Sequence, residues 1–213
     1  MILLSINSLS CYSIYGVFRL PTLRDEQKTK TRALLLKKAV YLFSKHGFAA
    51  VRTIDLAKEA GVSHGTVFAH FEKREDLIAT VIDEFGKRCV RSLHKANSNE
   101  DKLPRILEAH LTSIKEVEPF YCFLLKEKWL LPREANNTLL CMQSAISFHI
   151  YRSLRSEKNE KYLKNFPMHL IFNTWIGLLH HYLGNKEFFA PKGSVIERYG
   201  KELLSHFLRL IQY

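Results

Sequence analysis

The chain has 213 residues, of which 46% are hydrophobic and 25% are charged, so it can bury a substantial core, which argues against wholesale disorder. Its net charge of +11 favours an anionic partner, either nucleic acid or a membrane surface. The charge is concentrated, because residues 28–95 hold 14 Lys and Arg against 7 Asp and Glu and therefore carry +7 of the +11.

The first 18 residues lack charged side chains, yet five of them are serine or asparagine. That polar content is unsuited to a membrane span, and neither the basic start nor the cleavage site of a signal peptide is visible. We predict a disordered extension over residues 1–27. Because no later stretch is long and apolar enough to cross a bilayer, no membrane partner is expected.

A charged linker at residues 24–32 is predicted to run into the first helix. One apolar stripe then recurs at helical spacing, formed by Leu36, Ala39, Val40 and Phe43. Gly47 follows Lys45 and His46, a pattern typical of a helix C-terminus. Lys28, Lys30 and Arg32 either solvate the start of this helix or form a flexible basic arm.

Two short helices come next. Thr53 is predicted to cap the first of them, with Asp55 in its first turn, and Gly61 ends it. Ser63 is a second capping residue, for a helix that runs to about Phe71. Two helices of about two turns each, joined by a tight turn, predict a helix-turn-helix.

A long fourth helix carries a further apolar stripe, formed by Ile78, Val81, Ile82, Phe85 and Cys89, and it ends near residues 96–99. Five more helical patterns follow, at residues 101–116, 119–129, 132–156, 166–183 and 194–212. No stretch shows the alternation of a β-strand. The fold class predicted is therefore all-α.

The helix-turn-helix meets specific steric needs. Ala57 is small enough for the crossing of the two helices, Gly61 tolerates the turn, and Val62 and Val67 are apolar residues that lock the second helix onto the first. The outer face of the second helix must enter a major groove. The residues on or near that face are His64, Gly65, Thr66, Phe68 and Ala69.

Over residues 36–77 the sequence resembles the tetracycline-repressor (TetR) family of bacterial transcription regulators. The resemblance implies a three-helix DNA-binding domain at residues 28–74 and a larger helical effector-binding and dimerisation domain at residues 75–213. It also implies a cytoplasmic homodimer that binds a palindromic double-stranded DNA operator. Such a protein would be a repressor released by a small-molecule effector. The alternatives are a transcriptional activator or a nonspecific nucleic-acid-binding protein.

The resemblance implies a set of DNA-binding residues: Thr53, Ser63, His64, Gly65, Thr66, Phe68, Ala69, His70 and Arg74. Thr53, His70 and Arg74 would contact phosphates, whereas Thr66 can offer a hydroxyl or a methyl group to a base. His64 either contacts a base or is an inert surface histidine. Phe68 replaces a tyrosine that is usual in the family and cannot donate its hydrogen bond. Lys73 occupies a usual capping position.

The last two helical patterns, residues 166–183 and 194–212, are the predicted pairing surface. Aromatic residues of the middle helices either fill the core or line a pocket for an apolar or aromatic molecule. The candidate ligand-binding residues are Phe120, Phe123, Trp129, Phe148, Tyr151, Phe172 and Trp175.

No catalytic motif is found, so we do not expect an enzyme. The four cysteines, Cys11, Cys89, Cys122 and Cys141, form no C-x-x-C pair, which fits reduced thiols in the cytoplasm. His180 and His181 point about 100° apart on a helix and would not converge on one ion. Neither a metal site nor a cofactor is predicted.

Overall fold

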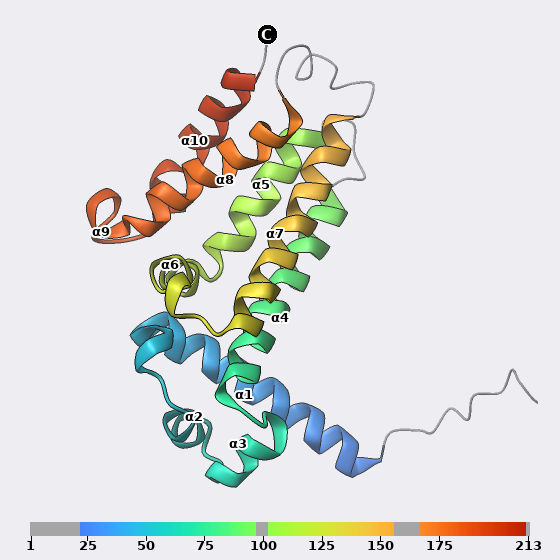
Figure 1. Ribbon diagram of the computed structural model, residues 1–213, viewed down its shortest axis with the longest axis vertical. Coiled ribbons are helices and arrows are strands. Elements are labelled where there is room, and N and C mark those ends of the chain that lie inside the picture. The colour runs from blue at the N-terminus through green and yellow to red at the C-terminus, as the bar shows by residue number, and fades with distance from the viewer. Residues whose placement is uncertain (1–21, 97–101, 156–166, 212–213) are drawn as a thin grey trace, which may run out of the picture.

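In the computed structural model, the described residues, 22–96, 102–155 and 167–211, form helices and no strand (Figure 1). This confirms the predicted all-α class. The elements are α1 (Leu23–Ala50), α2 (Thr53–Ala60), α3 (His64–His70), α4 (Arg74–Ala96), α5 (Lys102–Lys115), α6 (Glu118–Lys126), the 3-10 helix η1 (Lys128–Leu130), α7 (Arg133–Leu154), α8 (Met168–Gly184), α9 (Lys186–Phe189) and α10 (Val195–Ile211).

The start of α1 corrects the predicted linker. A capping box begins the helix, because the Asp25 backbone N donates to Thr22 Oγ1 (3.2 Å) and the Thr22 backbone N donates to Asp25 Oδ2 (3.0 Å). Residues 24–32 are therefore helical, and residues 23–27 belong to α1 and not to the predicted extension. Residues 1–21 lie outside the described part of the chain.

Gly47 interrupts α1 as predicted. Its φ of 79° lies in the left-handed region, so the regular helix stops there and a short further turn leads to Ala50. The backbone N–H groups of Phe48 and Ala49 donate to Glu127 Oε2 at 2.7 and 2.9 Å. The end of α1 is thus bound to the end of α6.

Helix α4 connects the lower and upper parts of the molecule and packs along α7 and α5 (Figure 1). Its predicted stripe is confirmed, since Ile78, Val81, Ile82, Phe85 and Cys89 are all buried. At Gly86 a Cβ atom would lie 2.8 Å from Met142 Cγ, so the absence of a side chain allows α4 and α7 to approach closely.

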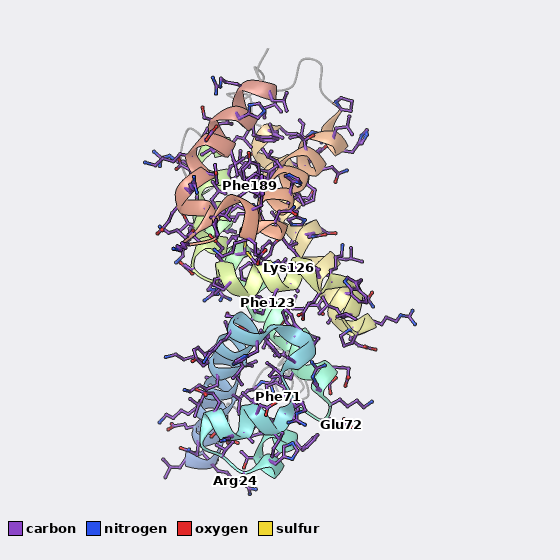
Figure 2. All side chains as sticks on the ribbon, turned by 90° about the vertical axis from the view of Figure 1, so that its left-hand side faces the viewer. Arg24, Phe71, Glu72, Phe123, Lys126 and Phe189 are labelled. Carbon is purple, nitrogen blue, oxygen red and sulfur yellow. The ribbon has the colours of Figure 1, made fainter. Side chains whose placement is uncertain are left out.

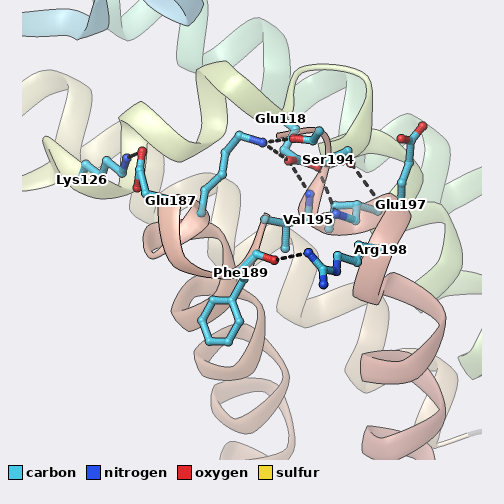
Figure 3. A network of polar contacts seen from close by, with 11 residues as sticks. Glu118, Lys126, Glu187, Phe189, Ser194, Val195, Glu197 and Arg198 are labelled. Carbon is cyan, nitrogen blue, oxygen red and sulfur yellow. Dashed lines mark hydrogen bonds and ion pairs between the residues drawn. The ribbon is translucent and has the colours of Figure 1, made fainter. Parts of the chain in front are cut away.

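A buried carboxylate begins α10. Glu118 accepts hydrogen bonds from the backbone N of Val195 (2.8 Å) and Ile196 (3.1 Å), from Ser194 Oγ and from Lys186 Nζ (3.2 Å), as Figure 3 shows. Burial raises the pKa of Glu118, but these hydrogen bonds outweigh it and hold the pKa below its ordinary value. The carboxylate therefore satisfies the first N–H groups of α10 and ties that helix to α6.

Two polar pairs lie between α8 and the helices α5 and α6. Trp175 Nε1 donates to His110 Nδ1 (3.0 Å), and Tyr121 Oη lies 2.9 Å from His180 Nε2. Burial lowers the pKa of His110 to about 3 and that of His180 to about 4. Both rings are therefore neutral at pH 7 and act as hydrogen-bond partners in the core.

Candidate nucleic-acid interface

The turn between α2 and α3 has the predicted geometry. Gly61 has a φ of 67° and a ψ of 33°, and the Val62 backbone N donates to the Ala57 carbonyl at 3.0 Å. Ala57 and Val67 are buried and Val62 is half-buried. The predicted packing of α3 on α2 is confirmed.

Helix α3 keeps one face free. Gly65, Phe68 and Ala69 are exposed, and 46% of the Phe68 side chain is accessible. Ser63 caps the helix as predicted, because the Thr66 backbone N donates to Ser63 Oγ at 3.1 Å. The Thr66 hydroxyl lies 2.9 Å from the same oxygen. A short helix whose exposed face carries no charged side chain, and whose Gly65 and Ala69 are small, is suited to close approach to base edges.

Thr53 is not the cap that the sequence predicted. The N-cap position of α2 is Arg52, whose backbone N donates to Asp55 Oδ2 at 2.9 Å, and this hydrogen bond is the largest cause of the lowered Asp55 pKa. Thr53 is the first residue of the helix, and its Oγ1 lies 2.9 Å from His64 Nε2. The His64 ring packs on Phe68 with centroids 4.8 Å apart. Thr53, His64 and Phe68 therefore form one continuous surface across α2 and α3.

Arg74 lies against the backbone between α1 and α2. Its Nε donates to the Val51 carbonyl at 3.0 Å, and its Nη2 donates to the Phe48 carbonyl. The side chain is half-buried. These hydrogen bonds compete with the phosphate contact that the sequence predicted, and they fix the start of α4 to the module formed by α1, α2 and α3.

The end of α3 is bound to α1. Arg32 Nη1 donates to the His70 carbonyl at 2.8 Å, and the guanidinium lies 4.4 Å from the centroid of the Phe71 ring. The alternative of a flexible arm is therefore wrong for Lys28, Lys30 and Arg32, which lie within α1. Burial, followed by the nearby Arg32 and Lys28, lowers the pKa of His70, so its ring is neutral at pH 7.

A polar hollow separates the start of α1 from α3. Arg24 and Lys28 line it from α1, and Thr66 and His70 line it from α3. Figure 2 shows Arg24 at the end of the molecule that carries Phe71 and Glu72. Arg24 is not among the residues that the sequence predicted for the interface. The signal available was its i, i+4 spacing to Lys28 within a helix that begins at a Thr-x-x-Asp capping box.

The seven aromatic candidates for ligand binding are not gathered around one cavity. Trp175 and Phe120 are fully buried, the first packed on Phe207 and the second between Phe48 and Phe85. Trp129, Phe148 and Tyr151 are exposed, by 79%, 59% and 37%. Phe123 and Phe172 are half-buried. Helical spacing of aromatic residues does not distinguish a pocket from a core or a surface.

Within residues 22–96, 102–155 and 167–211, no group of three or more His, Cys, Asp or Glu side chains is placed to hold a metal ion. In the same ranges, no helix combines the length and the apolar character that crossing a membrane requires.

These features define a helix-turn-helix protein, in which a three-helix module with an exposed α3 is followed by a larger helical domain. Residues 35–81 match the model of the bacterial regulatory proteins of the tetR family. Over these residues the chain is similar to that family.

The curated relatives are matched over part of their length. An HTH-type transcriptional repressor of Mycobacterium tuberculosis is 35% identical over 92 residues, which cover 43% of this chain and 46% of the relative. The HTH-type transcriptional regulator TtgR of Pseudomonas putida is 31% identical over 97 residues, which cover 46% of this chain and 39% of that protein. The chain thus spans less than half the length of both relatives.

Solved structures extend the likeness to the fold as a whole. The crystal structure of PfmR, a TetR family transcriptional regulator from Thermus thermophilus, matches with a TM-score of 0.69 over 82% of this chain and 97% of PfmR. The sequence identity is 22%, so this likeness concerns the fold alone.

Proposed function

We propose that this protein is a sequence-specific, DNA-binding transcription regulator that represses its target and has no enzymatic role. The observation that carries the proposal is the exposed face of α3, which follows the Gly61 turn and is flanked by cations of α1. The M. tuberculosis relative is named a transcriptional repressor, which supports repression over activation.

In this proposal the residues of the interface have different tasks. Gly65, Thr66, Phe68 and Ala69 face the bases of a major groove, and His64 contacts either a base or the adjoining backbone. Thr53, Ser63 and His70 lie beside them and contact phosphates. Arg74 adds to binding mainly by holding α4 against the turn between α1 and α2.

We further propose that a cytoplasmic homodimer places two copies of α3 on a palindromic operator, with half-sites about 34–36 Å apart. Helices α8 and α10 form the pairing surface. Leu170 of α8 and Leu210 of α10 support this proposal, because both are large apolar side chains that stay exposed in one copy. Binding of a small apolar or aromatic effector would release the operator by favouring a different spacing of the two α3 helices.

The test is to select preferred sequences from a random DNA library and then to measure affinity over a salt series. A specific regulator binds its selected site at least about 1,000-fold more tightly than unrelated DNA. Equal affinity for all duplexes at every salt concentration would favour nonspecific nucleic-acid binding instead. Reporter transcription from the selected site then separates repression from activation.

Replacing both Arg24 and Lys28 with alanine should weaken binding to all DNA sequences to a similar degree. Two phosphate contacts would be lost, so the slope of log K against log salt should fall by about 2. Lys30→Ala is the control, because Lys30 is an exposed cation of α1 that does not line the hollow. An equal effect of the control would argue against the hollow as a backbone contact.

Thr66→Ala should change the preferred operator sequence more than the salt slope, because this side chain faces bases in the proposed complex. The measurement is a second library selection with the variant. An unchanged selection profile, together with normal folding by circular dichroism, would exclude a base contact.

A further inference from the structure

A groove lies at the junction of the DNA-binding module and the larger domain. Its volume is about 280 Å³, and α1, α4 and the first turn of α6 form its walls. Its floor is apolar, with Leu36 and Val40 from α1, Phe85 from α4 and Phe120 from α6. Leu36 and Val40 are half-buried, whereas Phe85 and Phe120 are buried. The groove thus offers an apolar surface that is partly open to solvent.

Cations predominate at the rim of this groove. Lys37 of α1 and Arg88 and Arg91 of α4 line it, against a single acid, Glu84, so the lining carries a net charge of +2 (three cations less one acid). All four side chains are exposed. Their field attracts an anion to an apolar site.

The ion pairs of these rim residues are weak. Arg88 Nε lies 3.9 Å from Glu116 Oε2, at the limit of an ion pair, and both side chains are about half exposed. Glu84 Oε1 lies 3.5 Å from Nζ of Lys87, a residue that does not line the groove. This ion pair partly neutralises the single acid at the rim. The Arg88 guanidinium therefore retains N–H donors for a ligand.

We propose that this groove binds a small amphipathic anion, with its apolar body on Leu36 and Val40 and its carboxylate at Arg88 and Arg91. A guanidinium matches a carboxylate with two parallel hydrogen bonds, which a neutral head group cannot reproduce. A volume of about 280 Å³ lies at the small end of ligand pockets, so the apolar body is a single substituted ring or a short branched chain.

Because of where the groove lies, a ligand bound in it would change the affinity for DNA. This step rests on the proposed function. Helix α1 belongs to the module that carries α3, whereas α4 and α6 belong mainly to the larger domain. A ligand that contacts both α1 and α4 binds one relative orientation of the two parts more tightly than others. It therefore shifts the affinity for the operator by the same factor by which DNA shifts the affinity for the ligand.

The binding test uses the full chain and a matched pair of probes, 4-tert-butylbenzoate and the uncharged 4-tert-butylbenzamide, in titration calorimetry. The benzoate should bind about tenfold or more tightly than the amide, because only it forms charge-assisted hydrogen bonds with arginine. Combined replacement of Arg88 and Arg91 with alanine should remove that preference. Arg105→Ala, at an exposed cation on α5, should keep it, and Val40→Phe, which narrows the groove, should weaken both probes.

Equal binding of the two probes, or an unchanged preference after Arg88 and Arg91 are replaced, would overturn the proposed site. A second measurement titrates operator DNA with and without the benzoate. A change in operator affinity that is lost in the double variant supports the regulatory role, and benzoate binding without any such change contradicts it. A wild-type chain that prefers no DNA sequence would contradict the proposed function and leave the calorimetric result intact.

Discussion

Replacing Glu118 with alanine should lower the free energy of unfolding by about 3 kcal/mol, because it leaves the buried end of α10 without its carboxylate and Lys186 without the acid of its ion pair. The side chain of Glu118 is only 3% exposed, so water cannot replace the lost acceptor. Urea unfolding followed by circular dichroism measures this loss. Glu187→Ala is the matched control, since Glu187 also pairs with a lysine, Lys126, but is 72% exposed and should change stability by less than about 1 kcal/mol.

The pH dependence gives an independent check on Glu118. Its pKa in the folded protein lies below the value of about 4.3 for an unperturbed glutamate, so its stabilising contribution is complete at neutral pH. The contribution is lost as the pH falls below about 4.3 and through the lowered folded-state pKa. Glu118→Gln should be less stable at pH 7 and should approach the wild type in acid. A constant difference between the two proteins from neutral pH into acid would show that the charge of Glu118 does not matter.

Gly47→Ala should lower the free energy of unfolding, measured in urea, by about 3 kcal/mol or more. A Cβ atom at this position would overlap with Glu127 Oε1 and lie 2.9 Å from Phe123 Cδ1. The backbone at Gly47, with a φ of 79° and a ψ of 172°, lies in a region that is essentially restricted to glycine, which adds about 1–3 kcal/mol for any residue with a side chain. Moving Glu127 aside also breaks its hydrogen bonds to Phe48 and Ala49, which are worth about 1.5–3 kcal/mol each when the acceptor is charged.

Gly61→Ala is the control for a glycine with a positive φ and no steric contact. Gly61 has a similar φ of 67°, but a Cβ atom added there would meet nothing within 4 Å, so the expected cost is about 1–2 kcal/mol. A double-mutant cycle with Glu127→Ala isolates the overlap with Glu127, because the cost of Gly47→Ala should fall once Glu127 is shortened. Equal costs for the two glycine variants in the wild-type background would refute the overlap.

The helix-turn-helix was predictable because its determinants are local. Ala57, Gly61, Val62 and Val67 act within eleven residues, and each has a steric reason to be small, turn-forming or apolar. The stripe on α4 was predictable for the same reason, since helical periodicity marks the buried face. The resemblance to a known family relied on these local residues as well.

Hydrogen bonds from side chains to backbone groups far away in the sequence could not be predicted from local patterns. Arg74 is 23 residues from Val51, and Arg32 is 38 residues from His70, so no spacing rule connects them. The predicted cap of α2 was wrong for another reason. Arg52 and Thr53 are neighbours, and sequence patterns locate helix ends only to within about one or two residues. The start of α1 was missed because its charged residues suggested a linker, although Thr22 and Asp25 are a capping pair.

The aromatic residues show the limit of periodicity. Phe148 and Ile150 lie two residues apart on α7 and point about 200° apart, so only one of them can face the core; Ile150 is buried and Phe148 is 59% exposed. Which of them faces the core depends on where α4 and α5 lie, and that is a tertiary property. The candidate ligand site was therefore the least predictable part of the molecule.

Helix α6 is fastened at both ends by its own acids. Glu118 in its first turn holds the start of α10, and Glu127 just beyond its last turn holds the backbone at Phe48 and Ala49. The helix has nine residues, about 13 Å along its axis, and a single helix of that length resists compression. We therefore expect a displacement of α10 along α6 to move the backbone at Phe48 and Ala49, which leads into α2. If α10 lies in the pairing surface, the mutual orientation of two subunits and the tilt of each α2–α3 pair are mechanically linked.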